Sequence, residues 1–311
     1  MNLERRPPAY LIFDIETVPD IVLLDQYYGE SGSFPNETIW NQWEHAQHLM
    51  EKNNITFPGV VFHSICSICA LIIHPETFQI IDGLRLSVKD PTSHQDFLSK
   101  EKIMLESFWR FATKYKEVHK QWYDTLQSDF KLSDYQRKKL KPIPICFSGF
   151  NITGFDLPVV EHRSIKHRVV CPISEYGQEF GYDSYRSKFA LDKTLDLLAF
   201  LHPGGGRMSA GGLQALALSL GLAGKLEGMD GKKVAEAFFK DKAISTIEEY
   251  CAVDVLITYG VFLAVQKFRG IISDSLYAEA VKAFGLFLSH EGKPKSYREL
   301  LQGSAAFFST V

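Results

Sequence analysis

The stretch that decides the fold is Tyr10-Leu11-Ile12-Phe13-Asp14-Ile15-Glu16-Thr17-Val18-Pro19. Most of its first six residues are aromatic or branched and apolar, which predicts a strand that is buried on both faces and stops near Pro19. Side chains two residues apart on a strand point to the same face, so the carboxylates of Asp14 and Glu16 are expected side by side. Such a pair repels itself in apolar surroundings unless a divalent cation lies between the two acids. The alternative interpretation is a strand end whose acids face water.

Two later segments carry carboxylates in comparable settings. Asn151-Ile152-Thr153-Gly154-Phe155-Asp156-Leu157-Pro158 follows an apolar run over 143–147 and precedes an expected helix from about Leu157. Tyr250-Cys251-Ala252-Val253-Asp254 lies within a long helical pattern over 243–268, where residues four apart share one face. A lone carboxylate at Asp254 is costly among its apolar neighbours. It either caps a neighbouring loop or shares a positive partner with the other acids.

Together the three segments resemble the three motifs of the DEDDy 3′-to-5′ exonucleases: D-x-E on a strand, then N-x-x-x-F-D, then Y-x-x-x-D on a helix. Within that superfamily the chain is most similar to the bacterial stand-alone exonucleases related to the proofreading domain of family B DNA polymerases. The resemblance extends from about Tyr10 to about Phe268. Members of the related DEDDh group have a histidine five residues before the last aspartate, where this chain has Glu249.

The resemblance implies an α/β, ribonuclease-H-like (DnaQ-like) fold, with a mixed five-stranded sheet flanked by helices. It also implies two Mg²⁺ or Mn²⁺ ions as cofactors and phosphodiester hydrolysis by a two-metal-ion mechanism. Asp14 would bridge both ions, Glu16 and Asp254 would complete the site of the water-activating ion, and Asp156 would hold the second ion. Tyr250 would orient the attacking water.

The implied substrate is the 3′ end of a single-stranded nucleic acid, with DNA favoured over RNA, released as nucleoside monophosphates in a DNA-repair role. Asn151 would contact the terminal nucleotide or order its own loop. Thr17, Val18 and Phe155 would contact the terminal sugar and base, because apolar and aromatic faces accept any base. Two alternatives remain open: a 3′-to-5′ exoribonuclease similar to the ribonuclease D group, and a catalytically silent protein of the same fold that binds nucleic-acid ends.

Composition restricts how a nucleic acid can bind. The 311 residues carry a formal net charge of −3, so no general basic surface is expected, and contact should be confined to an end or a cleft. The only concentrated basic stretch, over 131–141, is either a solvated surface or a patch that steers phosphates through Arg137, Lys138, Lys139 and Lys141. The glycine-rich stretch over 204–212 is expected to be a loop from which Arg207 is a candidate substrate contact.

The cysteines and the apolar segments indicate a cytoplasmic protein. The five cysteines are odd in number and mostly lie in apolar runs, as reduced core residues do. Cys66 and Cys69 have the spacing of a metal or redox pair, but on a strand their side chains point to opposite faces. No apolar run is expected to be long enough to cross a membrane.

We expect one exonuclease domain over 1–311, with insertions at about 20–57 and 119–142. A helical C-terminal extension from about 271, with two short helices, leaves no room for a polymerase domain. The first insertion is expected to pack on the rim with a partial view of the cleft. Runs over 60–73 and 78–86 predict an antiparallel pair, and 143–148 predicts the next strand. A last strand over 191–197 carries Asp192 and Asp196, which compete with Asp156 as ligands; the resemblance favours Asp156 and gives Asp196 a supporting role.

Overall fold

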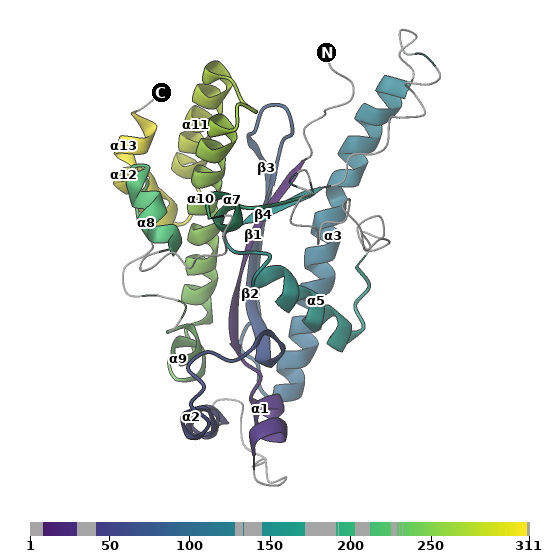
Figure 1. Ribbon diagram of the computed structural model, residues 1–311, viewed down its shortest axis with the longest axis vertical. Coiled ribbons are helices and arrows are strands. Elements are labelled where there is room, and N and C mark those ends of the chain that lie inside the picture. The colour runs from purple at the N-terminus through teal and green to yellow at the C-terminus, as the bar shows by residue number, and fades with distance from the viewer. Residues whose placement is uncertain are drawn as a thin grey trace.

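Five strands form one mixed sheet, with β1 (Tyr10–Pro19) at its centre (Figure 1). The computed structural model describes residues 9–29, 42–127, 133, 145–171, 191, 193–202, 212–224, 229, 231 and 233–309. The strand order is β3-β2-β1-β4-β5. β1 pairs antiparallel with β2 and parallel with β4, so the sheet is antiparallel on one side of β1 and parallel on the other. The other strands are β2 (His63–Ile73), β3 (Ile80–Ser87), β4 (Cys146–Gly149) and β5 (Thr194–Asp196).

Helices cover both faces of this sheet. The long helix α3 (His94–Gln127) and α5 (Asp156–His167) lie on one face, and α10 (Ile244–Phe268) and α11 (Asp274–Ser289) lie on the other (Figure 1). The architecture is therefore the mixed five-stranded α/β sheet that the sequence predicts. The remaining described helices are α1 (Ile21–Tyr28), α2 (Gln42–Lys52), the short 3-10 helix η1 (Val60–Phe62), α7 (Leu197–Leu201), α8 (Gly212–Ser219), α9 (Val234–Phe239), α12 (Lys295–Gly303) and α13 (Ala305–Phe308).

The alternation of side chains along β1 divides the apolar interior into two cores. Leu11, Phe13 and Ile15 are buried in the core that α3 and α5 cover. Tyr10 and Ile12 are buried in the core that α10 and α11 cover. Because the side-chain period of a strand is two, the same alternation directs the even-numbered acids of β1 toward α10. Burial on both faces confirms the expectation drawn from the apolar composition of this strand.

Most expected elements form, with shifted bounds. The antiparallel pair is confirmed as β2 and β3, although the first residues of the apolar run form η1 instead of a strand. The strand expected over 191–197 is reduced to β5. The expectation of two short C-terminal helices is wrong, since α11 alone has 16 residues and α12 and α13 follow it. These helices form because apolar residues such as Val281 and Phe284 pack onto α10.

The long helix α10 corrects another expectation. Its most apolar window has a mean hydropathy of 1.5, so by length and composition it is a candidate membrane span, contrary to the statement that no run is long enough. However, 83% of that window is buried inside the protein. The helix lies between the sheet and the C-terminal helices, and its apolar composition is accounted for by packing on two sides (Figure 1).

The cysteines of β2 lie on opposite faces of the sheet, as the strand period predicts. Cys66 belongs to the core beside α3, and Cys69 belongs to the core beside α10. All five cysteines are free thiols. A shared zinc ion or a disulfide between Cys66 and Cys69 is therefore excluded by geometry.

A buried ion network joins α5 and α3 to the end of β1. Arg163 of α5 donates to Glu101 of α3 at 2.7 Å and to Asp20 at 2.6 Å, and all three side chains have 0% exposure. Glu101 also accepts the backbone N–H of Ile65 at 2.7 Å. Burial opposes ionisation of Asp20, but Arg163 and Lys166 outweigh it and lower the pKa of Asp20 to about 2. The network is thus fully charged, and it holds α5 against the strands.

Several predictions concern residues outside the described part of the chain. They include the four basic residues over 137–141, Asp192, and Arg207 with the glycine-rich stretch before Gly212. These remain predictions.

Candidate active site

Three carboxylates from two distant elements meet beside the centre of the sheet. Oxygen atoms of Asp14 and Glu16, on β1, and of Asp254, on α10, all lie within 4.8 Å of one another. Glu16 is 7% exposed and Asp254 is 2% exposed, whereas Asp14 is partly exposed and opens the group to solvent. The expected convergence of the first and last acidic segments is confirmed. Such close burial of three acids is unfavourable unless positive charge compensates them.

Asp156 adjoins this group but is not part of it. Its Oδ1 atom accepts the backbone N–H of Ile15 at 3.2 Å, which fixes the carboxylate against the middle of β1. The N–H of Ile15 is available because β4 pairs with β1 only as far as Ile12, and the ladder stops there. Burial, followed by the negative charge of Asp14, raises the pKa of Asp156 well above its ordinary value. Asp156 and Asp14 are therefore electrostatic neighbours that cannot both ionise cheaply without a cation.

The loop from β4 to α5 brings Asp156 to β1 through close backbone contacts. A Cβ atom on Gly149 would lie 2.9 Å from the carbonyl oxygen of Phe13 and 2.2 Å from the Ile152 side chain, so only glycine allows this approach. Asn151 then turns the chain with φ of 65°, a conformation that asparagine tolerates better than most residues. Its side chain lies over Gly154, where a Cβ atom would come within 2.6 Å of Asn151 Oδ1. Gly149 and Gly154 therefore allow the close backbone packing of this loop.

Asp196 supports this loop instead of lining the acidic group. Its carboxylate accepts the backbone N–H groups of Asn151 and Thr153, each at 3.0 Å, and the hydroxyl of Thr153 at 2.5 Å. It also caps α7 by accepting the N–H groups of Leu198 and Ala199. Both carboxylate oxygens are therefore committed to the protein's own donors. The supporting role expected for Asp196 agrees with these contacts.

The remaining predicted residues lie around the acids in different surroundings. Tyr250 is one helical turn before Asp254 on α10, and its side chain is 1% exposed. Thr17 follows Glu16, and its hydroxyl lies 2.9 Å from His63 Nδ1. Phe155 directly precedes Asp156 and is partly buried. Val18 is 1% exposed within the core beside α3, so its main chain is the part left for a substrate contact.

Sequence reasoning missed His63 and Phe57 as neighbours of the site. Phe57 precedes Pro58 in a segment without periodic pattern, and His63 lies within the run over 60–73, which indicates only a strand. Their position depends on how the segment before β2 folds back on β1, and a local pattern does not report this. In the described part of the first insertion, Trp43 of α2 is buried and stacks on Phe239 of α9, with ring centres 5.1 Å apart.

The donor set fits divalent cations of the Mg²⁺ or Mn²⁺ type. Asp14, Glu16 and Asp254 offer carboxylate oxygens, which are the ligands that hard cations prefer. Neither a thiol nor an imidazole belongs to this group, as a zinc or copper site would need. Asp156 stands close enough to Asp14 for the charge of Asp14 to affect it, and its carboxylate could serve a second ion.

Residues 138–302 match the family described as predicted 3′–5′ exonucleases related to the exonuclease domain of PolB. The chain belongs to this family. The match covers just over half of the chain and includes Asp156 of α5 and Asp254 of α10. The match begins after β1. Asp14 and Glu16, which belong to the acidic group, therefore lie outside the matched region. A search of curated proteins finds no match.

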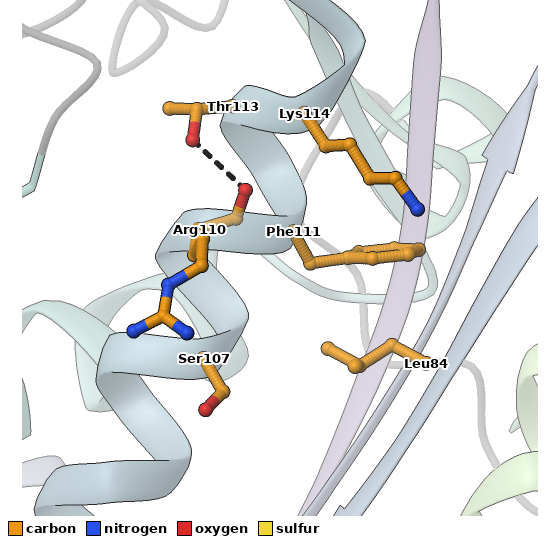
Figure 2. Close-up of a pocket in the computed structure, with 6 residues that line it drawn as sticks. All are labelled: Leu84, Ser107, Arg110, Phe111, Thr113 and Lys114. Atoms are coloured by element: carbon orange, nitrogen blue, oxygen red, sulfur yellow. Dashed lines mark hydrogen bonds between the residues drawn. The ribbon is translucent and has the colours of Figure 1, made fainter.

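A separate shallow hollow lies between α3 and β3 (Figure 2). Phe111, Leu84 and Lys114 lie on the same side of α3, next to the strands (Figure 2). Lys114 pairs with Asp82 at 2.8 Å. None of the residues that line the hollow is a carboxylate, and we assign the hollow no role in metal binding. It is lined by Leu84, Ser107, Arg110, Phe111, Thr113 and Lys114.

Divalent cations are expected to raise the thermal stability of the protein, because they would relieve repulsion among the three acids. At a cation concentration about 100 times the dissociation constant, stabilisation should be about 2.7 kcal/mol. Melting curves in EDTA and then in excess Mg²⁺ or Mn²⁺ measure this gain. Asp254→Asn should lose most of it. Asp274→Asn is the matched control, since Asp274 is an exposed acid paired with Lys267, and it should respond like the wild type. An equal gain in all three proteins would contradict the assignment.

Proposed function

We propose that the protein is a metal-dependent 3′-to-5′ exonuclease that hydrolyses single-stranded DNA ends to nucleoside monophosphates, using two Mg²⁺ or Mn²⁺ ions. The observation that carries the proposal is the convergence of Asp14 and Glu16 with Asp254 within 4.8 Å. Membership of the predicted exonuclease family supports it. The central position of β1 in the mixed sheet supports the further proposal that the fold is ribonuclease-H-like and the site of the DEDDy type.

Each acid has a distinct part in the proposed reaction. Asp14, which belongs to the group and whose charge also affects Asp156, would be shared by both ion positions. Glu16 and Asp254 would complete one position and Asp156 the other. The ions, when bound, would supply the positive charge that activates the attacking water and stabilises the leaving 3′ oxygen. The hydrogen bond from Ile15 N–H keeps Asp156 in place before substrate arrives.

The other residues would hold the reactants in position. Tyr250 would donate a hydrogen bond from its hydroxyl to the attacking water and orient it, one turn away from Asp254. Thr17, the main chain of Val18, and Phe155 would contact the terminal nucleotide, since they neighbour the acids along the chain. Asn151 would mainly shape the loop, because its side chain lies over Gly154. A cytoplasmic location is proposed from the five free thiols.

A ladder assay tests the proposal. DNA and RNA single strands of equal sequence, labelled at the 5′ end, are incubated with Mg²⁺, with Mn²⁺ and with EDTA. We expect products that shorten one nucleotide at a time from the 3′ end, only with metal, and faster with DNA. Faster shortening of RNA would replace the DNA assignment with an exoribonuclease. Binding of the strands without any ladder under all conditions would reject the enzyme and leave an end-binding protein of the same fold.

A further inference from the structure

Phe57, His63 and Phe155 form an aromatic cluster that neighbours the acidic residues at two points along the chain. Thr17 directly follows Glu16, and Phe155 directly precedes Asp156, so single peptide units join this cluster to two proposed ligands. His63 links the two segments. Its Nδ1 atom lies 2.9 Å from Thr17 Oγ1, and its ring packs edge-on against Phe155, with ring centres 4.9 Å apart and an angle of 90°.

Phe57 adds a third ring that faces solvent. Its centre lies 4.8 Å from the His63 ring and 5.5 Å from the Phe155 ring. His63 is 3% exposed, whereas Phe57 is 65% exposed. In this cluster His63 is therefore buried, and the ring of Phe57 is exposed to solvent.

His63 fixes the segment that carries Phe57. Its Nε2 atom lies 3.0 Å from the carbonyl oxygen of Pro58, which can only accept, so Nε2 carries the proton. Nδ1 of the neutral ring then accepts the hydroxyl proton of Thr17. Burial lowers the pKa of His63, in agreement with a neutral ring. Pro58 is buried, and the His63 side chain connects it to Thr17. The backbone next to Phe57 is therefore already positioned, so binding should cost little conformational entropy there.

We propose that Phe57 is a stacking platform for the base of the terminal nucleotide at a single-stranded 3′ end. The proposal rests on the exonuclease function, which places such an end at the neighbouring acids. An aromatic face accepts every base, as an enzyme that removes successive nucleotides requires. The net charge of −3 leaves little general attraction for phosphates, so stacking has to supply more of the affinity. Phe57 lies outside the region that matches the exonuclease family.

Tyr27 offers a matched control. Its side chain is 69% exposed, close to the value for Phe57, but its ring packs against Tyr28 at 4.8 Å and Phe62 at 5.5 Å. Replacing Tyr27 by alanine removes a similar exposed aromatic surface from the same part of the protein. It leaves the cluster of His63 and Phe155 untouched.

Phe57→Ala is expected to raise KM for single-stranded DNA by about 5- to 150-fold, the range given by the loss of one base–aromatic stack. The change in kcat should be small, because stacking holds the substrate equally in the ground and transition states. Tyr27→Ala should match the wild type, and Phe57→Trp should restore KM. On a strand whose terminal nucleotide is abasic, wild type and Phe57→Ala should behave alike. Equal KM values for Phe57→Ala and Tyr27→Ala, or an equal loss on the abasic strand, would overturn the proposal.

A second measurement separates this inference from the nuclease assignment. A strand with 2-aminopurine as its 3′ base and a hydrolysis-resistant phosphorothioate at the terminal linkage is titrated with protein. Stacking should quench its fluorescence with wild type and Tyr27→Ala, but not with Phe57→Ala. Quenching that depends on Phe57 in a protein without a cleavage ladder would keep the platform and reject the nuclease. A ladder without Phe57-dependent quenching would keep the nuclease and reject the platform.

Discussion

Asp14→Ala is expected to abolish hydrolysis of single-stranded DNA. Asp14 belongs to the group of three carboxylates and is also the electrostatic neighbour of Asp156, so its loss would affect both proposed ion positions. Metal stabilisation of the transition state is worth several kcal/mol, which corresponds to a loss of about 10³-fold or more in kcat/KM. The measurement is the rate of shortening of a labelled oligonucleotide in excess Mg²⁺ or Mn²⁺.

Tyr250→Phe gives the graded comparison. It removes a single hydroxyl and leaves all four carboxylates, so it should reduce the rate by less than Asp14→Ala does. In EDTA, Asp14→Ala should unfold at or above the temperature of the wild type, because removing one of three crowded acids relieves repulsion. Wild-type rates in Asp14→Ala, with a folded protein, would contradict the metal assignment.

Arg163→Met is expected to lower the free energy of unfolding by about 3–5 kcal/mol, because it removes the buried cation that pairs with two buried carboxylates. The guanidinium of Arg163 pairs with both Glu101 and Asp20, and none of these three side chains reaches solvent. Lys166 and His167 also pair with these acids, but their side chains are more exposed than Arg163. Methionine keeps the volume of the side chain and removes only its charge and donors. Urea denaturation monitored by circular dichroism measures the loss.

Lys166→Met is the matched control for this experiment. Lys166 contacts the same carboxylate of Asp20 at 2.6 Å, but its side chain is 35% exposed. A partly exposed ion pair contributes about 1 kcal/mol or less, so this variant should be only slightly destabilised. If both variants lost the same small amount, the buried network would not be what holds α5 against the strands.

The parts of the fold that could be predicted are those that a local pattern encodes. The apolar run of β1 and the two-residue spacing of Asp14 and Glu16 are sufficient to predict a central strand with both acids on one face. The four-residue spacing of Tyr250 and Asp254 likewise predicts one face of a helix. Tertiary packing brings the carboxylates of the two faces within 4.8 Å of one another. Only the resemblance to exonucleases predicted this convergence.

Other features depend on contacts that no local pattern reports. Charged residues are usually exposed, so a local pattern places them on the surface. Helix packing nevertheless buries Arg163, Glu101 and Asp20 together. Phe57 lies in an unpatterned segment, and a histidine on a neighbouring strand decides its position. The composition of α10 alone does not separate a core helix from a membrane span, because both are apolar on all sides.

The division of the acids between β1 and the later helices has a consequence for fragments of this protein. A piece restricted to residues 138–302 contains the whole family match but lacks the carboxylates of Asp14 and Glu16. Recognition of that piece in a genome would therefore not by itself indicate a competent nuclease. Conversely, two polypeptides divided between β3 and β4 would each carry only part of the acidic group, and the group would form again only when the halves reassembled around the central strand.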